Sequence, residues 1–132
     1  MKKILISILL LLIGGNLFGQ YTTTKIQTNT LTTSKMIYNY QTEKWDFVSN
    51  NDLTQFVSVW VFNVSNENTG MISNGTVNYD ILSYKQVENA AYLKVYNTKV
   101  GRTMEIVIQK GDQGLGVAVF DKTDRIAYYF FP

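Results

Sequence analysis

The sequence predicts an all-β protein: a single antiparallel meander that forms a small barrel or sandwich, preceded by a helical signal peptide. Two observations carry this prediction. After residue 20, about seven to nine short segments of alternating apolar and polar residues follow one another at spacings of roughly 8–12 residues, with turn-forming residues between them. None of these segments keeps the 3.6-residue period of an amphipathic helix, although 89–96 admits a helical turn. Short connections favour antiparallel neighbours.

Residues 1–19 have the three-part layout of a secretory signal peptide. Lys2 and Lys3 form a positive start, Ile4–Ile13 is an apolar run, and Gly19 offers a small residue for cleavage. The ending Leu17–Gln20 resembles signal peptides of Bacteroidetes, which implies a bacterial protein exported to the periplasm, the outer surface or the medium. The apolar run is shorter than the ~20 residues of a transmembrane helix. We therefore expect residues 1–19 to be cleaved off and not to remain as an uncleaved membrane anchor. The mature chain is expected to have no stable membrane insertion.

The mature chain is expected to be one domain without net charge. We expect residues 20–34 to be a Thr-rich leader or a weak edge strand, and residues 35–132 to form the all-β domain. Removing the two leader lysines leaves 10 of the 12 basic residues against 10 acidic ones. No basic stripe remains for nucleic acid, which we exclude as a partner. The chain has no cysteine, so a hydrophobic core without disulfides must stabilise it.

The first half of the mature chain contains a weak segment followed by a hairpin. Ile26 and Leu31 differ in strand parity, so 20–34 forms no single apolar face. Segments 35–40 and 45–48 each place aromatic residues on one face and are separated by a short polar stretch, which predicts a hairpin.

The stretch Gln55–Ser65 is the strongest strand signal. Apolar side chains occupy both of its faces: Phe56, Trp60, Phe62 and Val64 on one, Val57, Val59 and Val61 on the other. This predicts a central strand covered on both sides, with Trp60 as a core anchor. The segment is also uncharged and β-prone, which makes it an aggregation hazard when exposed.

The second half reads as further short strands. They are expected near 71–72, 76–87, 90–100, 102–110, 115–121 and 125–131. The parity of apolar residues switches at Ile81–Leu82, which indicates a bulge. Met104, Ile106 and Ile108 alternate with polar residues and are expected to face the core.

The residue types argue against catalysis and metal binding. Histidine and cysteine are absent, which removes the commonest general base, the thiolate nucleophile and nearly every transition-metal site. Gly111–Gly116 precedes a strand and not a helix. It therefore predicts a hairpin turn and not a phosphate-binding loop. Asp121–Asp124 is predicted to be a plain turn and not a calcium-binding loop. We therefore expect that the protein is not an enzyme and that it binds no metal and no cofactor.

The aromatic content is the one feature that suggests binding. Aromatic residues occur on nearly every predicted strand, and cross-strand packing explains most of them. The alternative is an exposed aromatic face or barrel mouth. On that hypothesis the best candidates are Tyr38, Tyr40 and Trp45 on the first hairpin and Tyr129 near the C-terminus.

The functional prediction is an exported, non-catalytic binding or interaction module, whose partner is an unknown protein, a glycan or a small apolar ligand. One alternative is a small barrel that carries an apolar ligand in the manner of lipocalin-like proteins. The other is a carboxylate-dependent hydrolase or an enzyme inhibitor. An internal apolar cavity favours the carrier, a filled core with surface aromatics favours the binding module, and paired carboxylates in a cleft favour the hydrolase.

Overall fold

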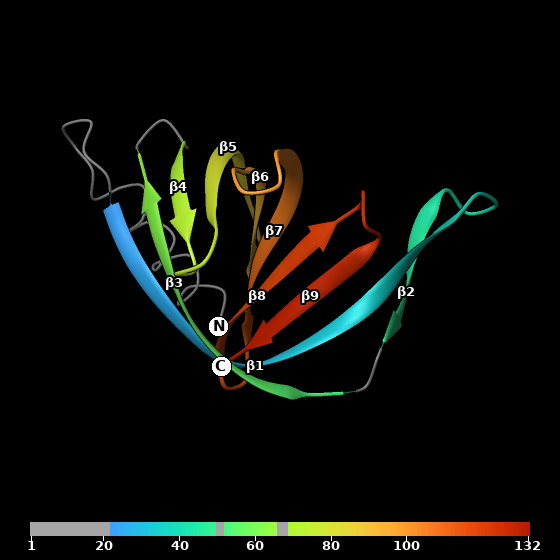
Figure 1. The fold of residues 1–132 in the computed structure, drawn as a ribbon, viewed down its shortest axis with the longest axis horizontal. Helices are drawn as coiled ribbons and strands as arrows, with labels where there is room; N and C mark the ends of the chain where they lie inside the picture. Colours follow the sequence, from blue (N-terminus) through green and yellow to red (C-terminus); the bar gives the residue numbers. More distant parts are fainter. Residues whose placement is uncertain (1–21, 50–51, 66–68) are drawn as a thin grey trace.

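The computed structural model describes residues 22–49, 52–65 and 69–132, and the predicted signal peptide, residues 1–19, lies outside them. The described chain consists of strands joined by turns (Figure 1). They are β1 (Thr22–Asn39), β2 (Lys44–Ser49), β3 (Thr54–Val64), β4 (Gly70–Ser73), β5 (Asn78–Val87), β6 (Ala90–Asn97), β7 (Arg102–Gly111), β8 (Gly114–Asp121) and β9 (Ile126–Phe131). Every neighbouring pair is antiparallel.

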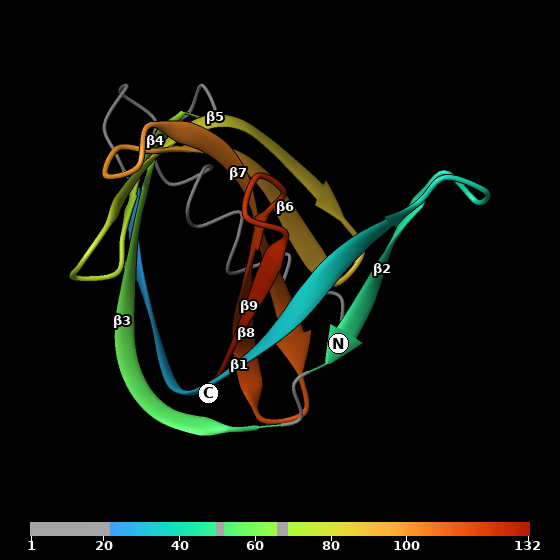
Figure 2. The same cartoon turned by 45° about the vertical axis from the view of Figure 1, so that its right-hand side comes forward.

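Eight of the described strands close into a barrel. The order runs β1-β3-β4-β5-β6-β7-β8-β9, and β9 pairs back with β1 (Figure 2). Closure pairs strands that would otherwise form the two edges of an open sheet. The all-β meander is confirmed, and of the two architectures expected, the barrel is the one observed. β2 lies outside the ring and pairs with β1 alone.

The long first strand closes the barrel. Thr22–Thr28 pair with β3, and Thr30–Lys35 pair with β9. The Thr-rich stretch is therefore a strand that continues past residue 35. Among the described strands its residues 22–28 pair with β3 alone, so their other side is an edge, whereas residues 30–35 are covered on that side by β9. The register with β3 shifts between Thr28 and Thr30. That shift allows Ile26 and Leu31, which differ in parity, both to pack on the same core.

The core fills the barrel with large side chains. The fully buried members are Trp60, Phe62, Val64, Ile72, Val95, Ile106, Ile108 and Val117. Trp60 stacks near Tyr79 and meets Phe130 edge-on at 4.9 Å between ring centroids. Its indole Nε1 donates a hydrogen bond of 3.1 Å to Thr28 Oγ1, which satisfies both buried polar groups. Trp60 is thus the anchor that its sequence position predicted.

The expectation that β3 is covered on both faces is wrong. Its inward residues are buried from Ser58 onward, but Val57 and Val59 are 59% and 44% exposed. The reason is that a single-walled barrel has only one inside. One face of every wall strand meets water unless another layer covers it, and a strand's own sequence does not say whether such a layer exists.

Two smaller expectations had opposite outcomes. The bulge predicted at Ile81–Leu82 is confirmed, because the β5–β6 register shifts between Ile81 and Ser83. The helical turn admitted for 89–96 is wrong, since Ala90–Asn97 is strand β6, and its alternate side chains enter the core. Pairing with β5 and β7 on both sides outweighs any local preference for a turn.

The predicted hairpin forms an arm that projects from the barrel (Figures 1 and 2). We call residues 36–48 the arm. The last pair between β1 and β9 is Lys35 with Ile126, and Met36 N still donates to Arg125 O at 2.9 Å. Beyond that point the arm consists of β1 and β2 alone. At its root, the ring of Phe47 lies 5.8 Å from that of Phe120, which ties the arm to the outer wall.

We expect Trp60→Ala to destabilise the protein by about 3–5 kcal/mol, because it removes a fully buried indole and leaves a cavity. Against a typical total of about 5–15 kcal/mol, this loss is large. Urea unfolding followed by circular dichroism measures it. Trp45→Ala, on the arm, is the matched control and should cost far less. Equal midpoints for the two variants would contradict the assignment of the core.

Candidate functional site

A groove runs over the outer face of β8. In β8, Val117 and Val119 face the core, so Gly116 and Ala118 face outward between the two neighbouring strands. Ala118 lies directly between Val107 of β7 and Tyr129 of β9. Because Gly116 and Ala118 are small and their neighbours are large, the outer wall is hollowed along this part of the strand.

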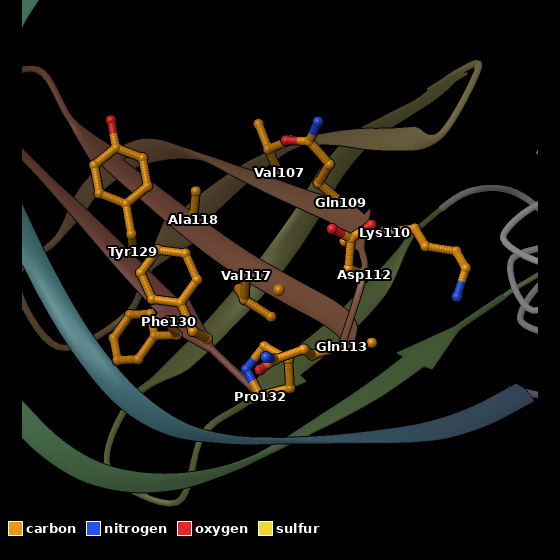
Figure 3. A pocket seen from close by; sticks show the side chains of 14 residues that line it. Val107, Gln109, Lys110, Asp112, Gln113, Val117, Ala118, Tyr129, Phe130 and Pro132 are labelled. Atoms are coloured by element: carbon orange, nitrogen blue, oxygen red, sulfur yellow. The ribbon is translucent and has the colours of Figure 1, made fainter. Parts of the chain in front are cut away.

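The groove has a volume of about 420 Å³, within the range of ~300–1,000 Å³ typical of small-molecule sites. Figure 3 shows Val107, Ala118 and Tyr129 side by side, with Gln109, Gln113 and Pro132 toward one end. Gly116 forms part of the lining without a side chain. A Cβ at that position would stand 3.3 Å from the carbonyl oxygen of Phe130, so the backbone leaves little room for one.

The chemistry of the lining is mixed and nearly neutral. Tyr129 and Phe131 contribute aromatic rings, and Gln109 and Gln113 contribute amides that both donate and accept hydrogen bonds. Lys110 and Asp112 bring one charge of each sign. The groove therefore presents flat apolar surface beside neutral hydrogen-bonding groups.

The aromatic residues of the arm form a second cluster on this outer face. The ring of Tyr38 lies 4.9 Å from that of Tyr40 and 5.2 Å from that of Trp45, both in edge contacts. The structure thus brings together three of the four residues predicted for binding.

Tyr129, the fourth predicted residue, lies apart from the other three, on the barrel wall beside the groove. It opposes Thr32 of β1, which shares strand parity with Tyr38 and hence the same face. Two further rings connect the groove to the root of the arm: Phe120 lies 6.1 Å from Tyr129 and 5.8 Å from Phe47.

Sequence reasoning missed the residues that shape this surface. Gly116 was considered only as part of a turn and Ala118 not at all, although small residues at alternate positions of a strand signal a hollow when the neighbouring strands carry large ones. Phe120 was also missed. Its role depends on a contact with Phe47, which lies far away in the sequence.

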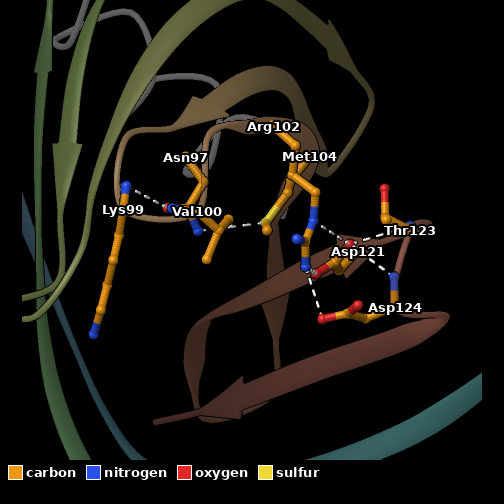
Figure 4. Close-up of polar contacts among 8 residues, drawn as sticks. All are labelled: Asn97, Lys99, Val100, Arg102, Met104, Asp121, Thr123 and Asp124. Carbon is orange, nitrogen blue, oxygen red and sulfur yellow. Dashed lines mark hydrogen bonds and ion pairs between the residues drawn. The ribbon is translucent and has the colours of Figure 1, made fainter.

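A smaller cavity of about 230 Å³ lies at one end of the barrel. It is lined by apolar core residues and by Tyr79, Tyr128, Arg102, Asp121 and Asp124. The Arg102 guanidinium donates hydrogen bonds to Asp121 at 3.2 and 2.6 Å and to Asp124 at 2.7 Å (Figure 4). Both carboxylates are therefore occupied by one cation.

The electrostatics of this end follow from burial and from that cation. Burial acts to raise the pKa of Asp121, but the hydrogen bonds from Arg102 and from the amides of Asp124 and Thr123 outweigh it, so the pKa lies below its usual value. Burial, aided by the charges of Tyr128 and Asp121, raises the pKa of Tyr79 to about 12. Near neutral pH this end thus holds an ionised carboxylate and a neutral phenol.

The two turn motifs have the structures predicted for them. Gly111–Gly116 forms the β7–β8 hairpin turn and continues as strand. Asp121–Asp124 is a turn in which Asp121 Oδ1 accepts hydrogen bonds from the amides of Thr123 and Asp124. The unexpected feature is the burial of Asp121, whose partner Arg102 lies on another strand.

Within the described ranges, no three or more His, Cys, Asp or Glu residues gather as a metal site would require. The same ranges contain no helix of the length and apolarity needed to span a membrane. Comparisons with protein-family models, with curated proteins and with solved structures find no match to this chain.

We expect the Arg102–Asp121 pair to make the fold acid-sensitive. Because the folded-state pKa of Asp121 lies below that of an unfolded chain, about 3.9, the ionised carboxylate stabilises the fold above that pH. The contribution is lost as pH falls through the lower folded-state pKa. Asp121→Asn should lower the melting temperature at pH 7 and flatten its decline below pH 4.

The control is Asp112→Asn, in an exposed turn. Thermal melts between pH 2.5 and 7 should show the parent's acid dependence in this control. A parent-like acid dependence in Asp121→Asn would contradict the role assigned to the pair.

Proposed function

We propose that this chain is an exported, non-catalytic binding module whose groove over β8 holds an extended oligosaccharide. The observation that carries the proposal is the groove itself: small residues at Gly116 and Ala118 between the rings of Tyr129 and Phe131 and the β7 side chains. A carbohydrate offers apolar C–H faces and a periphery of hydroxyl groups. The first pack on aromatic rings, and the second exchange hydrogen bonds with amides.

The balance of polar groups favours a neutral ligand. Lys110 and Asp112 offset one another, so the lining offers no field that would select an anion or a cation. Gln109 and Gln113 can serve hydroxyl groups as donor or acceptor without a charge. The cluster of Tyr38, Tyr40 and Trp45 adds a second platform on the same outer face, at the far side of Phe47 and Phe120.

The alternatives have less support. A carrier of apolar ligands needs interior space, but large side chains fill the barrel, and the cavity at its end, about 230 Å³, is below the usual size of ligand sites. A carboxylate-dependent hydrolase needs a carboxyl group that can give up or take a proton. The pKa of Asp121 is held low, and Asp124 is paired with the same Arg102.

We expect Tyr129→Ala and Ala118→Phe each to weaken oligosaccharide binding by about tenfold or more, the first by removing a stacking surface and the second by filling the groove. Electrophoresis in gels that contain soluble β-glucan, xylan or mannan measures this as loss of retardation. Tyr96→Ala, an equally simple truncation at an exposed tyrosine of β6 whose partner Thr103 is not among the groove residues, is the control. The absence of retardation in all three gels, or equal retardation of Tyr129→Ala and Tyr96→Ala, would contradict the proposal.

Export is tested separately from binding. We expect protein recovered from the periplasm or medium of the host to lack residues 1–19 and to begin at Gln20, because Gly19 supplies the small residue before the cut. Intact-mass spectrometry distinguishes this form from the full chain. Recovery of the uncleaved chain from the membrane fraction would overturn export as a released module.

A further inference from the structure

The cavity at the end of the barrel contains a phenol that has no hydrogen-bond partner. Tyr79 is only 5% exposed and lines the cavity, yet its hydroxyl forms no hydrogen bond with any residue of the described ranges. The hydroxyl of Tyr128, which lines the same cavity, forms none with those residues either. A buried polar group without a partner lowers the stability of a fold, so it calls for an explanation. The two phenol oxygens are available to a ligand inside the cavity.

The charged side chains that line this cavity carry more negative than positive charge. They are one guanidinium, that of Arg102, and two carboxylates, those of Asp121 and Asp124. Arg102 already donates hydrogen bonds to both carboxylates, so it offers little to an anion. Of the two oxygens of Asp124, only Oδ2 has a hydrogen-bond donor within the described ranges. The lining therefore favours a ligand with one positive charge.

The charges of the carboxylates act on both phenol oxygens. Burial raises the pKa of Tyr128 most, the charges of Asp121 and Asp124 raise it further, and Arg102 acts in the opposite direction. For Tyr79, burial and then the charges of Tyr128 and Asp121 raise the pKa. The same carboxylates that disfavour a negative charge on these phenols favour a positive charge beside them. A cation that enters must also replace its lost water with hydrogen bonds, and the two hydroxyl oxygens can accept them.

The rest of the lining and the size of the cavity suit a short alkyl chain. Val100, Met104 and Val119 contribute apolar surface, and Figure 4 shows the first two beside Arg102. A cavity of about 150 Å³ is large enough for benzene, and this one has a volume of about 230 Å³. Val100 is 48% exposed and lies at the mouth, whereas Tyr79 lies deep. A small ligand can therefore place its head group at the phenols and its chain toward the mouth.

We propose that this cavity binds a small aliphatic primary amine in its ammonium form. The ammonium group donates hydrogen bonds to the hydroxyl oxygens of Tyr79 and Tyr128, and the excess negative charge of the carboxylates balances its positive charge. A quaternary ammonium ion is less suitable, because it has no N–H group to donate to the phenols. This inference does not rest on the oligosaccharide proposal, since the cavity lies at the end of the barrel and the groove lies over the outer face of β8.

Titration of the mature chain with n-butylammonium, followed by nuclear magnetic resonance at constant ionic strength, tests the ligand class. The dissociation constant should be on the order of 1 mM, as expected for so small a ligand. Two probes separate charge from hydrogen bonding: n-butanol has a chain of the same length without the charge, and tetramethylammonium has the charge without an N–H group. Each should bind about tenfold more weakly or less. Equal binding of n-butanol, tighter binding of butyrate, or no saturable shift with n-butylammonium would overturn the proposal.

Substitution of Tyr79 separates binding from folding. Tyr79→Phe removes only the unpartnered hydroxyl, so the melting temperature should not fall, whereas the dissociation constant for n-butylammonium should rise about fivefold or more. Asp124→Asn should raise that constant about tenfold, because it removes the excess negative charge. Tyr92→Phe and Asp46→Asn make the same changes at exposed positions outside the cavity and should bind as the parent does. Parent-like binding by Tyr79→Phe, or equal weakening in Tyr92→Phe, would contradict the assigned site.

Discussion

Closure of the barrel by β1 is the constraint on which the rest of the structure depends. One strand must pair with β3 over Thr22–Leu31 and with β9 over Thr30–Lys35, and its register with β3 shifts between Thr28 and Thr30, where the two pairings meet. Closure gives the chain an inside, and the hydrophobic core around Trp60 fills it. Without disulfides, burial of this core is the main source of stability.

Closure also decides where function can reside. Because side chains fill the interior, the recognition that we propose uses the outer wall and the rims. The groove over β8 and the arm both arise there: the groove from two small outward residues, and the arm from the part of β1 that continues past β9. Both are consequences of strand pairing and strand length, and neither requires a special loop.

The sequence predicted those features that depend on local alternation. Met104, Ile106 and Ile108 face the core as expected, and the parity switch at Ile81–Leu82 marks a true irregularity. Features that depend on distant partners were not predictable. Asp121 looked like an ordinary turn residue because its partner, Arg102, lies on another strand. The exposure of Val57 and Val59 follows from the single-walled architecture, which residue composition does not reveal.

The grouping of the predicted aromatic residues could be foreseen only in part, for the same reason. Tyr38, Tyr40 and Trp45 belong to one hairpin, so their clustering follows from local pairing. The position of Tyr129 relative to them depends on the β1–β9 closure, and the groove beside it depends on three adjacent strands. Recognition of the groove required the neighbours of Gly116 and Ala118 to be known.

The most direct test of closure is nuclear magnetic resonance of the mature chain in solution, applied to the β1–β9 ladder. Cross-strand contacts between the backbones of Thr32 and Tyr129 and of Thr33 and Tyr128 should be present, because these residues are directly paired. Their absence, with amide exchange in residues 30–35 as fast as in an unfolded chain, would show an open sheet and contradict the account.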